Sequence, residues 1–295
     1  MFPRSRELIL PTTTTKDYRL VPNPTPFPSP PNYGSSTVTV GSKIFFIGGS
    51  SEPSSDLWIL DTRSGTMTQG PSMSVPRIGR DAAVGVIDGK IYVIGGGGFQ
   101  EEIQVEVFDP KSETWELAGM EYGGGKASRY SASVEGKVYM VEKYRKSVYN
   151  PREREGERLV RMVSQRLEKG GRKDTLKDTV DCVCVVDDVL FASVRWNGVM
   201  WFDTKLNVWR RLVGRDGKQL HSFTLHETSM AEHDGRLVVL WGESEVGDTY
   251  TMNVQCVLVS LDRSGDRICG TVDWSGIVAT VPYSFWFLHC LAVSE

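Results

Sequence analysis

The stretch Lys43-Ile-Phe-Phe-Ile-Gly48-Gly49 decides the fold, because it returns 47 residues later as Lys90-Ile-Tyr-Val-Ile-Gly95-Gly96. Weaker copies stand at the same phase in Lys137–Val141, Leu190–Val194 and Leu237–Gly242. A short apolar run that recurs at near-constant spacing is typical of a repeat architecture built from one supersecondary unit. The sequence therefore predicts five copies of such a unit.

A second motif follows each apolar run and ends in Asp or Asn. Its copies are Trp58–Asp61, Val107–Asp109, Val148–Asn150, Trp201–Asp203 and Val259–Asp262. A tryptophan stands six residues beyond the Asp in the second and fourth units, as Trp115 and Trp209. Two motifs that recur in the same order define the unit at both ends.

The second unit reads as a four-stranded antiparallel meander. We expect strands at Ala82–Asp88, Lys90–Ile94, Val105–Asp109 and Thr114–Ala118, with a tight turn at Asp88-Gly89-Lys90. One such sheet cannot bury both of its faces, whereas five or six around an axis can. The predicted fold is therefore an all-β propeller. A β-sandwich or open meander is disfavoured, because the period is near 47 residues and two copies carry diglycine at one phase.

Several of these motifs resemble kelch repeats, specifically those of plant F-box/kelch-repeat proteins. The segments that carry the resemblance are IYVIGG, VFDPKSETWE, PSMSVPR, Tyr18–Pro22 and the closing Val281–Val293. It covers roughly residues 16–295 in order, and it implies a kelch-type β-propeller. The expected repeats are about 36–80, 81–128, 129–179, 180–228 and 229–280, preceded by a proline-rich N-terminal segment, 1–35.

The resemblance also implies a function. In that family a helical F-box engages an SCF-type ubiquitin ligase, and the propeller that follows selects the target protein. Too few residues precede Lys16 for an F-box, and they lack helical periodicity. We therefore expect a protein-binding, non-enzymatic propeller without its F-box, which would bind the ligase adaptor only if an F-box were supplied elsewhere.

The two ends are expected to build an incomplete sixth blade. Phe285–Val293 would supply its first strand, while Glu7–Leu10 and Tyr18–Val21 would supply its third and fourth. Termini that share a blade close a propeller ring without a covalent link. The prediction is five full blades and a sixth that lacks one strand.

Composition bounds the partners and the compartment. A formal charge of −3 favours neither nucleic acid nor an acidic membrane. The chain has no apolar run long enough to span a bilayer and no secretory signal. Its five cysteines, an odd number in strand-like text, are typical of reduced thiols, which favours the cytoplasm or nucleus.

Galactose oxidase and sialidases are also propellers, so catalysis is an alternative to protein binding. The four histidines, His221, His226, His233 and His289, fit no metal-ligand spacing. There is no nucleophile elbow and no phosphate loop. We expect no cofactor and no metal. An alternative with a sugar or other small molecule as ligand rests on the arginines Arg77, Arg80, Arg129 and Arg195.

The turns between second and third strands, and the connections between blades, should share one face of the propeller. Arginine and aromatic side chains there are the usual anchors of protein interfaces. The residues expected to bind a partner on this face are Arg77, Arg80, Phe99, Gln100, Glu101, Arg129, Tyr144, Arg145, Trp196, Asn197, Glu243, Ser244 and Glu245.

The segment Arg152–Lys177 lengthens the third unit and mixes many basic residues with glutamates. Leu159, Val160, Val163 and Leu167 would share one face if the segment were helical. It is either a solvated insertion or a docking element for an acidic partner, in which case Arg158 and Arg161 would carry the binding.

Overall fold

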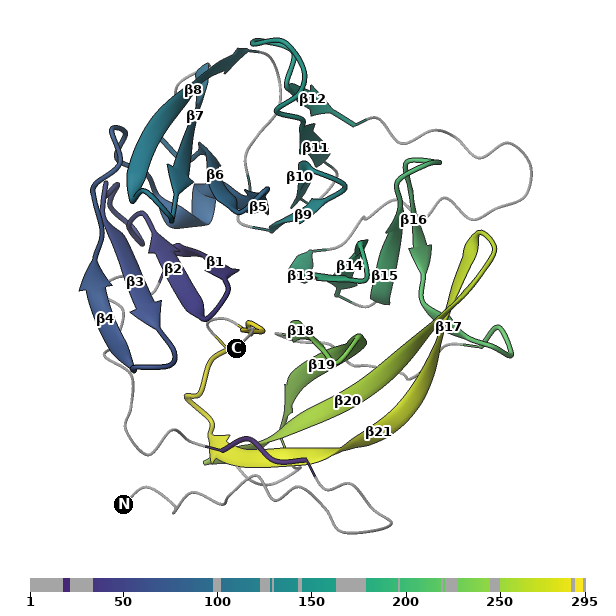
Figure 1. Cartoon of the computed structure of the whole chain (residues 1–295). Coiled ribbons are helices and arrows are strands. Elements are labelled where there is room, and N and C mark those ends of the chain that lie inside the picture. Colours follow the sequence, from purple (N-terminus) through teal and green to yellow (C-terminus); the bar gives the residue numbers. More distant parts are fainter. Residues whose placement is uncertain are drawn as a thin grey trace.

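Five antiparallel sheets stand around a common axis and form a propeller (Figure 1). The computed structural model describes residues 18–21, 34–97, 102–122, 128, 130–142, 145–162, 179–195, 197–218, 220, 228–244, 250–287 and 290–293. Each blade is a meander whose first strand lies nearest the axis and whose fourth lies at the rim (Figure 1). The predicted all-β propeller with five complete blades is thus confirmed.

The strands follow chain order within every blade. Blade 1 has β1 (Ser36–Val40), β2 (Lys43–Ile47), β3 (Leu57–Asp61) and β4 (Thr66–Gln69). Blade 2 has β5 (Ala82–Ile87), β6 (Lys90–Gly95), β7 (Glu102–Asp109) and β8 (Thr114–Tyr122). Blade 3 has β9 (Ser131–Val134), β10 (Lys137–Glu142), β11 (Arg145–Tyr149) and β12 (Leu159–Arg161). Blade 4 has β13 (Val180–Val186), β14 (Val189–Val194), β15 (Gly198–Asp203) and β16 (Val208–Arg211).

The fifth blade is larger than the others. It contains β18 (Ser229–His233), β19 (Arg236–Glu243), β20 (Thr251–Ser264) and β21 (Arg267–Pro282). The short β17 (Val213–Gly214), which leaves blade 4, pairs in parallel with β21 and joins the two blades. The described residues contain one short 3₁₀ turn, Gly79–Asp81, and no helix that is long and apolar enough to cross a membrane.

Backbone conformation explains the two recurring turn signals. At the tip of the β5–β6 hairpin both Asp88 and Gly89 have positive φ, 52° and 77°, as a type I′ turn requires. The second signal, the diglycine at the end of β2, lets another part of the backbone approach closely. Gly48 has φ 77°, and a Cβ there would lie 2.8 Å from the carbonyl oxygen of Arg77. Glycine therefore lets the connection between blades 1 and 2 pack directly on the end of β2.

Large apolar side chains fill the spaces between neighbouring blades. Phe45 of β2 and Phe108 of β7 are buried with ring centroids 6.0 Å apart, and Trp115 of β8 lies 5.0 Å from Phe108. Between blades 3 and 4, Phe202 contacts Tyr139 in the same way. The tryptophan that recurs after the Asp motif thus packs on the aromatic ring of its own third strand.

Serine hydroxyl groups also join the innermost strands of neighbouring blades. Ser36 Oγ lies 2.8 Å from the carbonyl oxygen of Ala82, to which it donates across the blade 1–blade 2 interface. Ser131 Oγ accepts from the N–H of Val84 at 2.9 Å and donates to its carbonyl at 3.0 Å. These bonds satisfy backbone groups of inner strands that face the next blade.

Replacing Ser131 by alanine is expected to destabilise the protein by about 1–3 kcal/mol, because both backbone groups of the buried Val84 lose their side-chain partner. Ser133 is the matched control. Its hydroxyl, two residues along β9, is buried and has no hydrogen-bond partner among the described residues. Ser133→Ala should be neutral or stabilising in urea unfolding. Equal losses for the two variants would contradict the assignment.

The terminal segments converge on blade 5, but their described parts form no strands. Residues 18–21 lie along β21 (Figure 1), where Leu20 N–H donates to the carbonyl of Val278 at 2.9 Å. Residues 285–287 and 290–293 are also without strand structure. The expected strands at Tyr18–Val21 and Phe285–Val293 are therefore corrected, and Glu7–Leu10 lies outside the described residues.

Side-chain packing takes the place of strand pairing at this junction. The long β20–β21 hairpin buries Val254, Cys256 and Val278 against a set of partly buried neighbours that includes Tyr18, Trp274, Phe285, Phe287 and Cys290. Tyr18 meets Trp274 edge to face, with ring centroids 5.0 Å apart. The hairpin, which continues beyond β19, offers enough apolar surface to hold both termini without a sheet.

All five cysteines are free, as the sequence predicts. Burial raises the pKa of Cys184 and Cys256 to about 12 and that of Cys290 to about 11. Such thiols are protonated at neutral pH and behave as small apolar side chains.

Candidate functional site: the loop face of the propeller

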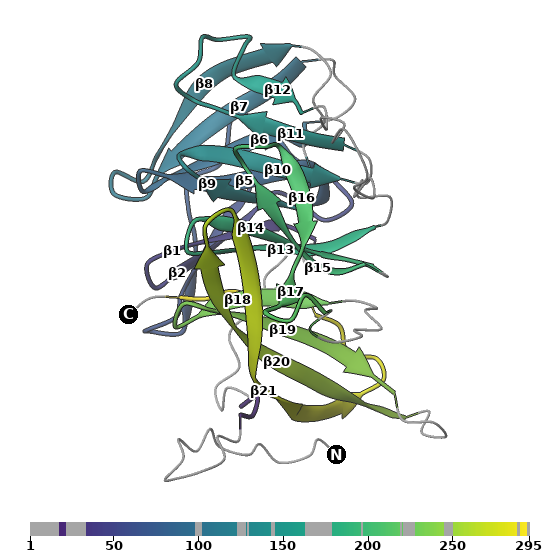
Figure 2. The ribbon, with the colours of Figure 1, turned by 90° about the vertical axis from the view of Figure 1, so that its right-hand side faces the viewer.

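Because neighbouring strands within each blade run antiparallel, the connections between them fall on two opposite faces of the propeller (Figure 2). One, which we call the loop face, carries the connections between second and third strands and those between blades. Its described connections are residues 48–56, 70–81, 96–97, 128, 130, 162, 179, 195, 197, 212–218, 220, 228, 244 and 250, and the end of β21 also lies there. The opposite turn face carries the tight hairpins of the first two strands, such as Asp88–Gly89, Asp187–Asp188 and Asp234–Gly235.

Arg77 lies beneath the loop face and not on it. Its side chain is 0% exposed and Nη2 is 2.8 Å from Oε2 of Glu106, which is also buried. Nη1 donates to the carbonyls of Gly95 and Gln104. Burial lowers the pKa of Arg77, and the hydrogen bond and charge of Glu106 oppose that shift. The expectation that Arg77 contacts a partner is therefore corrected: its guanidinium ties the connection between blades 1 and 2 to strands β6 and β7 of blade 2.

Glu106 completes this buried network through its other bonds. Its carboxylate accepts the backbone N–H groups of Ser74 and Val75, at 2.7 Å and 3.4 Å. These residues belong to the connection that carries the chain from blade 1 to blade 2. The buried Arg77–Glu106 pair therefore holds this loop-face connection in place through hydrogen bonds from the interior.

Other predicted residues do lie at the loop face. The Arg80 side chain is 59% exposed and only loosely paired with Asp81, at 3.9 Å. Asn197 accepts from Arg211 at 3.2 Å, and the exposed Glu243 accepts from Gln255 at 3.1 Å; Ser244 is exposed as well. Phe99, Gln100, Glu101, Arg129, Tyr144, Trp196 and Glu245 lie outside the described residues, and Arg145 is described only as the first residue of β11.

The described part of the insertion in the third unit consists of turns at residues 152–158 followed by a short strand, and it contains no helix. Leu159–Arg161 form β12, which pairs with β11 and completes blade 3. Arg158 donates to the carbonyls of Ala118 and Glu153, so its guanidinium is bound between blades 2 and 3. Arg161 is exposed at the edge of the blade. Val163 and Leu167 lie outside the described residues, and docking by Arg158 and Arg161 stays a prediction.

A buried lysine near this face escaped the sequence analysis. Lys146 of β11 is 9% exposed, and its Nζ lies 4.9 Å from the centroid of the Phe202 ring in blade 4. Burial lowers the pKa of Lys146 from 10.5 to about 8. The ring offers a cation–π contact, which compensates only part of the lost hydration.

Lys146→Met is expected to reduce the rise in the free energy of unfolding between pH 7 and pH 10. Between about pH 8 and pH 10.5 the unfolded chain holds the Lys146 proton and the folded chain has released it, so the free energy of unfolding rises with pH. Below pH 8 both states are protonated and the burial cost is fully present. Urea unfolding at pH 7 and pH 10 should show a smaller rise for Lys146→Met than for the parent, whereas the exposed Lys111→Met should match the parent. Equal rises for Lys146→Met and the parent would contradict this.

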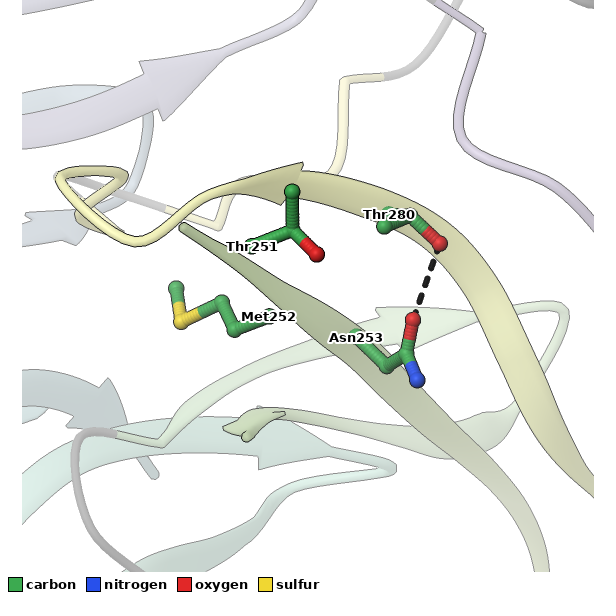
Figure 3. Close-up of a pocket in the computed structure, with 4 residues that line it drawn as sticks. All are labelled: Thr251, Met252, Asn253 and Thr280. Atoms are coloured by element: carbon green, nitrogen blue, oxygen red, sulfur yellow. Dashed lines mark hydrogen bonds between the residues drawn. The ribbon is translucent and has the colours of Figure 1, made fainter. Parts of the chain in front are cut away.

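Three exposed aromatic rings at the loop-face end of blade 5 were also missed. Tyr250, Tyr283 and Trp286 are 83%, 62% and 68% exposed. A shallow pocket of about 180 Å³ at the same end of the β20–β21 hairpin is lined by Thr251, Met252, Asn253 and Thr280, and Thr280 Oγ1 donates to Asn253 Oδ1 at 2.8 Å (Figure 3). The sequence offered one signal, since Tyr250 and Tyr283 immediately flank the last two strands of the fifth repeat.

The comparisons with known proteins agree with this geometry. The family model described as FKB95, Kelch-repeats domain, matches residues 4–279. The chain belongs to this kelch-repeat family. The resemblance to F-box/kelch-repeat proteins that the repeats predict is thereby confirmed.

Two relatives with similar sequences come from Arabidopsis thaliana. The putative F-box/kelch-repeat protein At2g41360 is 40% identical over 97% of this chain and 78% of its own length. The F-box/kelch-repeat protein At2g22030 is 34% identical over 88% of this chain and 68% of its own. The solved structure of YjhT has a TM-score of 0.52 at 12% identity, covering 87% of this chain and 96% of that one, and it supports the fold alone.

The described residues hold no group of three or more His, Cys, Asp or Glu side chains that could bind a metal ion. His233 is exposed at the turn face, where its Nε2 lies 3.5 Å from Asp234. His221, His226 and His289 lie outside the described residues.

Proposed function

We propose that this chain is a non-enzymatic, target-binding propeller of the F-box/kelch type, which holds a protein substrate of a ubiquitin ligase on its loop face. Membership in the kelch-repeat family and relatives named F-box/kelch-repeat proteins support the class. The whole assembly would need an F-box to engage the ligase, as the family resemblance implies.

The observation that carries the proposal is a difference between the two faces. On the turn face, the tips of the inner hairpins have positive φ at Asp88, Glu135, Asp187, Asp188 and Asp234. Turn geometry constrains the residue types there. The loop-face side chains of Arg80, Glu243 and Tyr250 are exposed without that constraint. Such a surface can vary to fit a partner while the blades remain intact.

Affinity purification with three matched baits tests this proposal. The parent chain should enrich a protein that the loop-face variant Arg80→Glu/Glu243→Arg no longer enriches. The turn-face variant Asp187→Asn/Asp188→Asn should still enrich it, since asparagine tolerates positive φ. Enrichment that the turn-face variant loses and the loop-face variant keeps would contradict the proposal.

Among the residues that the structure describes, the pocket beside Tyr250 does not favour the alternative of a sugar-binding or enzymatic propeller. Ligand pockets for drug-sized molecules usually enclose about 300–1,000 Å³ and bring a few polar or charged groups together. The pocket beside Tyr250 is smaller, at about 180 Å³, and none of the four residues that line it is charged.

A further inference from the structure

The junction between blade 5 and blade 1 differs from the other four junctions of the ring. Four apolar clusters are each shared by two successive blades, from blades 1 and 2 through to blades 4 and 5. The fifth cluster combines blade 5 with the terminal segments and contains no described residue of blade 1. The inner strands repeat this order, because β1 contacts β5, β5 contacts β9, β9 contacts β13 and β13 contacts β18, whereas β18 and β1 are not joined in this way. The terminal segments therefore cover a face of blade 5 that no neighbouring blade shares.

The C-terminal segment provides most of the aromatic cover. We call residues 285–287 and 290–293 the C-terminal strap. Its side chains Phe285, Phe287 and Cys290 pack on four buried residues of blade 5, which are Leu240, Val254, Cys256 and Val278. The two phenylalanine rings meet edge to face, with centroids 5.3 Å apart. Trp286, which stands between them in the sequence, is 68% exposed.

The C-terminal strap runs from the outer strand of blade 5 toward the centre of the propeller. Figure 1 shows its last described residues near the axis, beside β18. Cys290 is within electrostatic reach of the inner strand of blade 4, because the pKa of Cys184 on β13 is raised chiefly by burial and further by Cys290. The strap thus spans the width of one blade.

Hydrogen bonds do not hold the C-terminal strap to the blade. Phe285 N–H donates to the carbonyl of Pro282 at 2.9 Å in the turn that follows β21, and the other described residues of the strap form no hydrogen bond. A strand within a sheet can leave only when its ladder breaks. A segment that is held by side-chain packing alone can open at a lower free-energy cost than the blades can unfold.

We propose that the C-terminal strap opens and closes on blade 5 while the five blades stay folded. Opening uncovers the apolar face formed by Leu240, Val254, Cys256 and Val278. The strand ladders of blade 5 and the four clusters shared by successive blades remain intact, because none of them includes a residue of the strap. Burial of the two phenylalanine rings drives closure. This conformational device does not depend on the binding of a partner to the loop face.

Two native thiols allow the opening to be measured. Cys256 lies under the C-terminal strap and Cys290 belongs to it. Burial raises the pKa of Cys256 to about 12 and that of Cys290 to about 11, so both thiols react slowly while the strap is closed. The experiment follows labelling of the folded full chain by iodoacetamide, resolved by peptide mass spectrometry. Both thiols should be labelled below the urea concentration that unfolds the blades, at rates that hardly change with urea, because opening exposes little surface.

Variants of the strap should change these rates selectively. Phe285→Ala/Phe287→Ala should raise the labelling rates of Cys256 and Cys290 by at least about tenfold, because it removes the contacts that close the strap. Trp286→Ala is the matched control and should leave both rates unchanged, since that ring is exposed. Phe108→Ala, which removes a buried ring between blades 1 and 2, should also leave them unchanged, because opening does not require those blades to separate.

Two results would overturn the inference. One is labelling of Cys256 and Cys290 that begins only when the blades unfold and that has the same urea dependence as unfolding. The other is acceleration by Phe108→Ala as large as that by Phe285→Ala/Phe287→Ala, because global unfolding would then be the route to labelling. If the double variant does not fold, the urea dependence of labelling in the parent chain still decides between the two routes.

Discussion

Replacement of Arg77 by alanine is expected to destabilise the propeller by about 3–5 kcal/mol. The substitution leaves the Glu106 carboxylate buried without its charge partner, and it also removes the donor to the carbonyls of Gly95 and Gln104. Two backbone N–H groups still bind Glu106, but they cannot replace the guanidinium. Urea unfolding of the purified variant measures the loss.

Arg80 provides the matched control for this experiment. It is an arginine three positions along the same connection, but its side chain is 59% exposed. Arg80→Ala should change the free energy of unfolding by no more than about 0.5 kcal/mol. Glu106→Gln should also destabilise the protein strongly. It keeps the shape of the side chain but removes the negative charge that pairs with the buried Arg77 guanidinium. Near-equal stabilities for Arg77→Ala and Arg80→Ala would contradict a structural role for the ion pair.

Phe108→Ala is expected to cost about 3–5 kcal/mol, since it opens a cavity between two blades. Phe108 is 0% exposed and stands between the rings of Phe45 and Trp115. Its loss removes apolar contacts on both sides and leaves Trp115 without its packing partner. Thermal or urea unfolding of the variant gives the cost directly.

The control for Phe108 lies on the neighbouring strand of the same blade. Leu117 of β8 is 55% exposed, so Leu117→Ala should have an effect within about 0.5 kcal/mol of zero. A Phe108→Ala variant that is as stable as Leu117→Ala would show that the interface between blades 1 and 2 contributes little to the fold.

The repeat unit could be predicted from sequence because each of its signals is local. An Asp-Gly pair such as Asp88–Gly89 sets a hairpin by its own backbone preferences, and a run such as Lys90–Ile94 forms a buried strand. The same preferences recur at the same position in each repeat, so one blade can be predicted for each repeat. The placement of the two terminal segments is not local. They pack on the long β20–β21 hairpin, whose length no short motif of the fifth unit specifies.

The site was harder to predict for the same physical reason. Arg77 and Glu106 are 29 positions apart, and only the packing of blade 1 on blade 2 reveals that they pair in the interior. An arginine in a predicted loop reads as exposed when its partner is unknown. Trp286 was placed inside the expected strand Phe285–Val293, because the turn after Pro282 that precedes it has no strong signature.

The most direct test of the central claim, that a protein partner binds the loop face, is hydrogen–deuterium exchange of the chain with and without the partner that affinity purification identifies. We expect slower exchange in the presence of the partner at residues 48–56, 77–81, 242–244 and 250–253. The rate at the hairpin tips Asp88–Gly89, Asp187–Asp188 and Asp234–Gly235 should be unchanged. Slower exchange at those hairpin tips, with no change on the loop face, would contradict it.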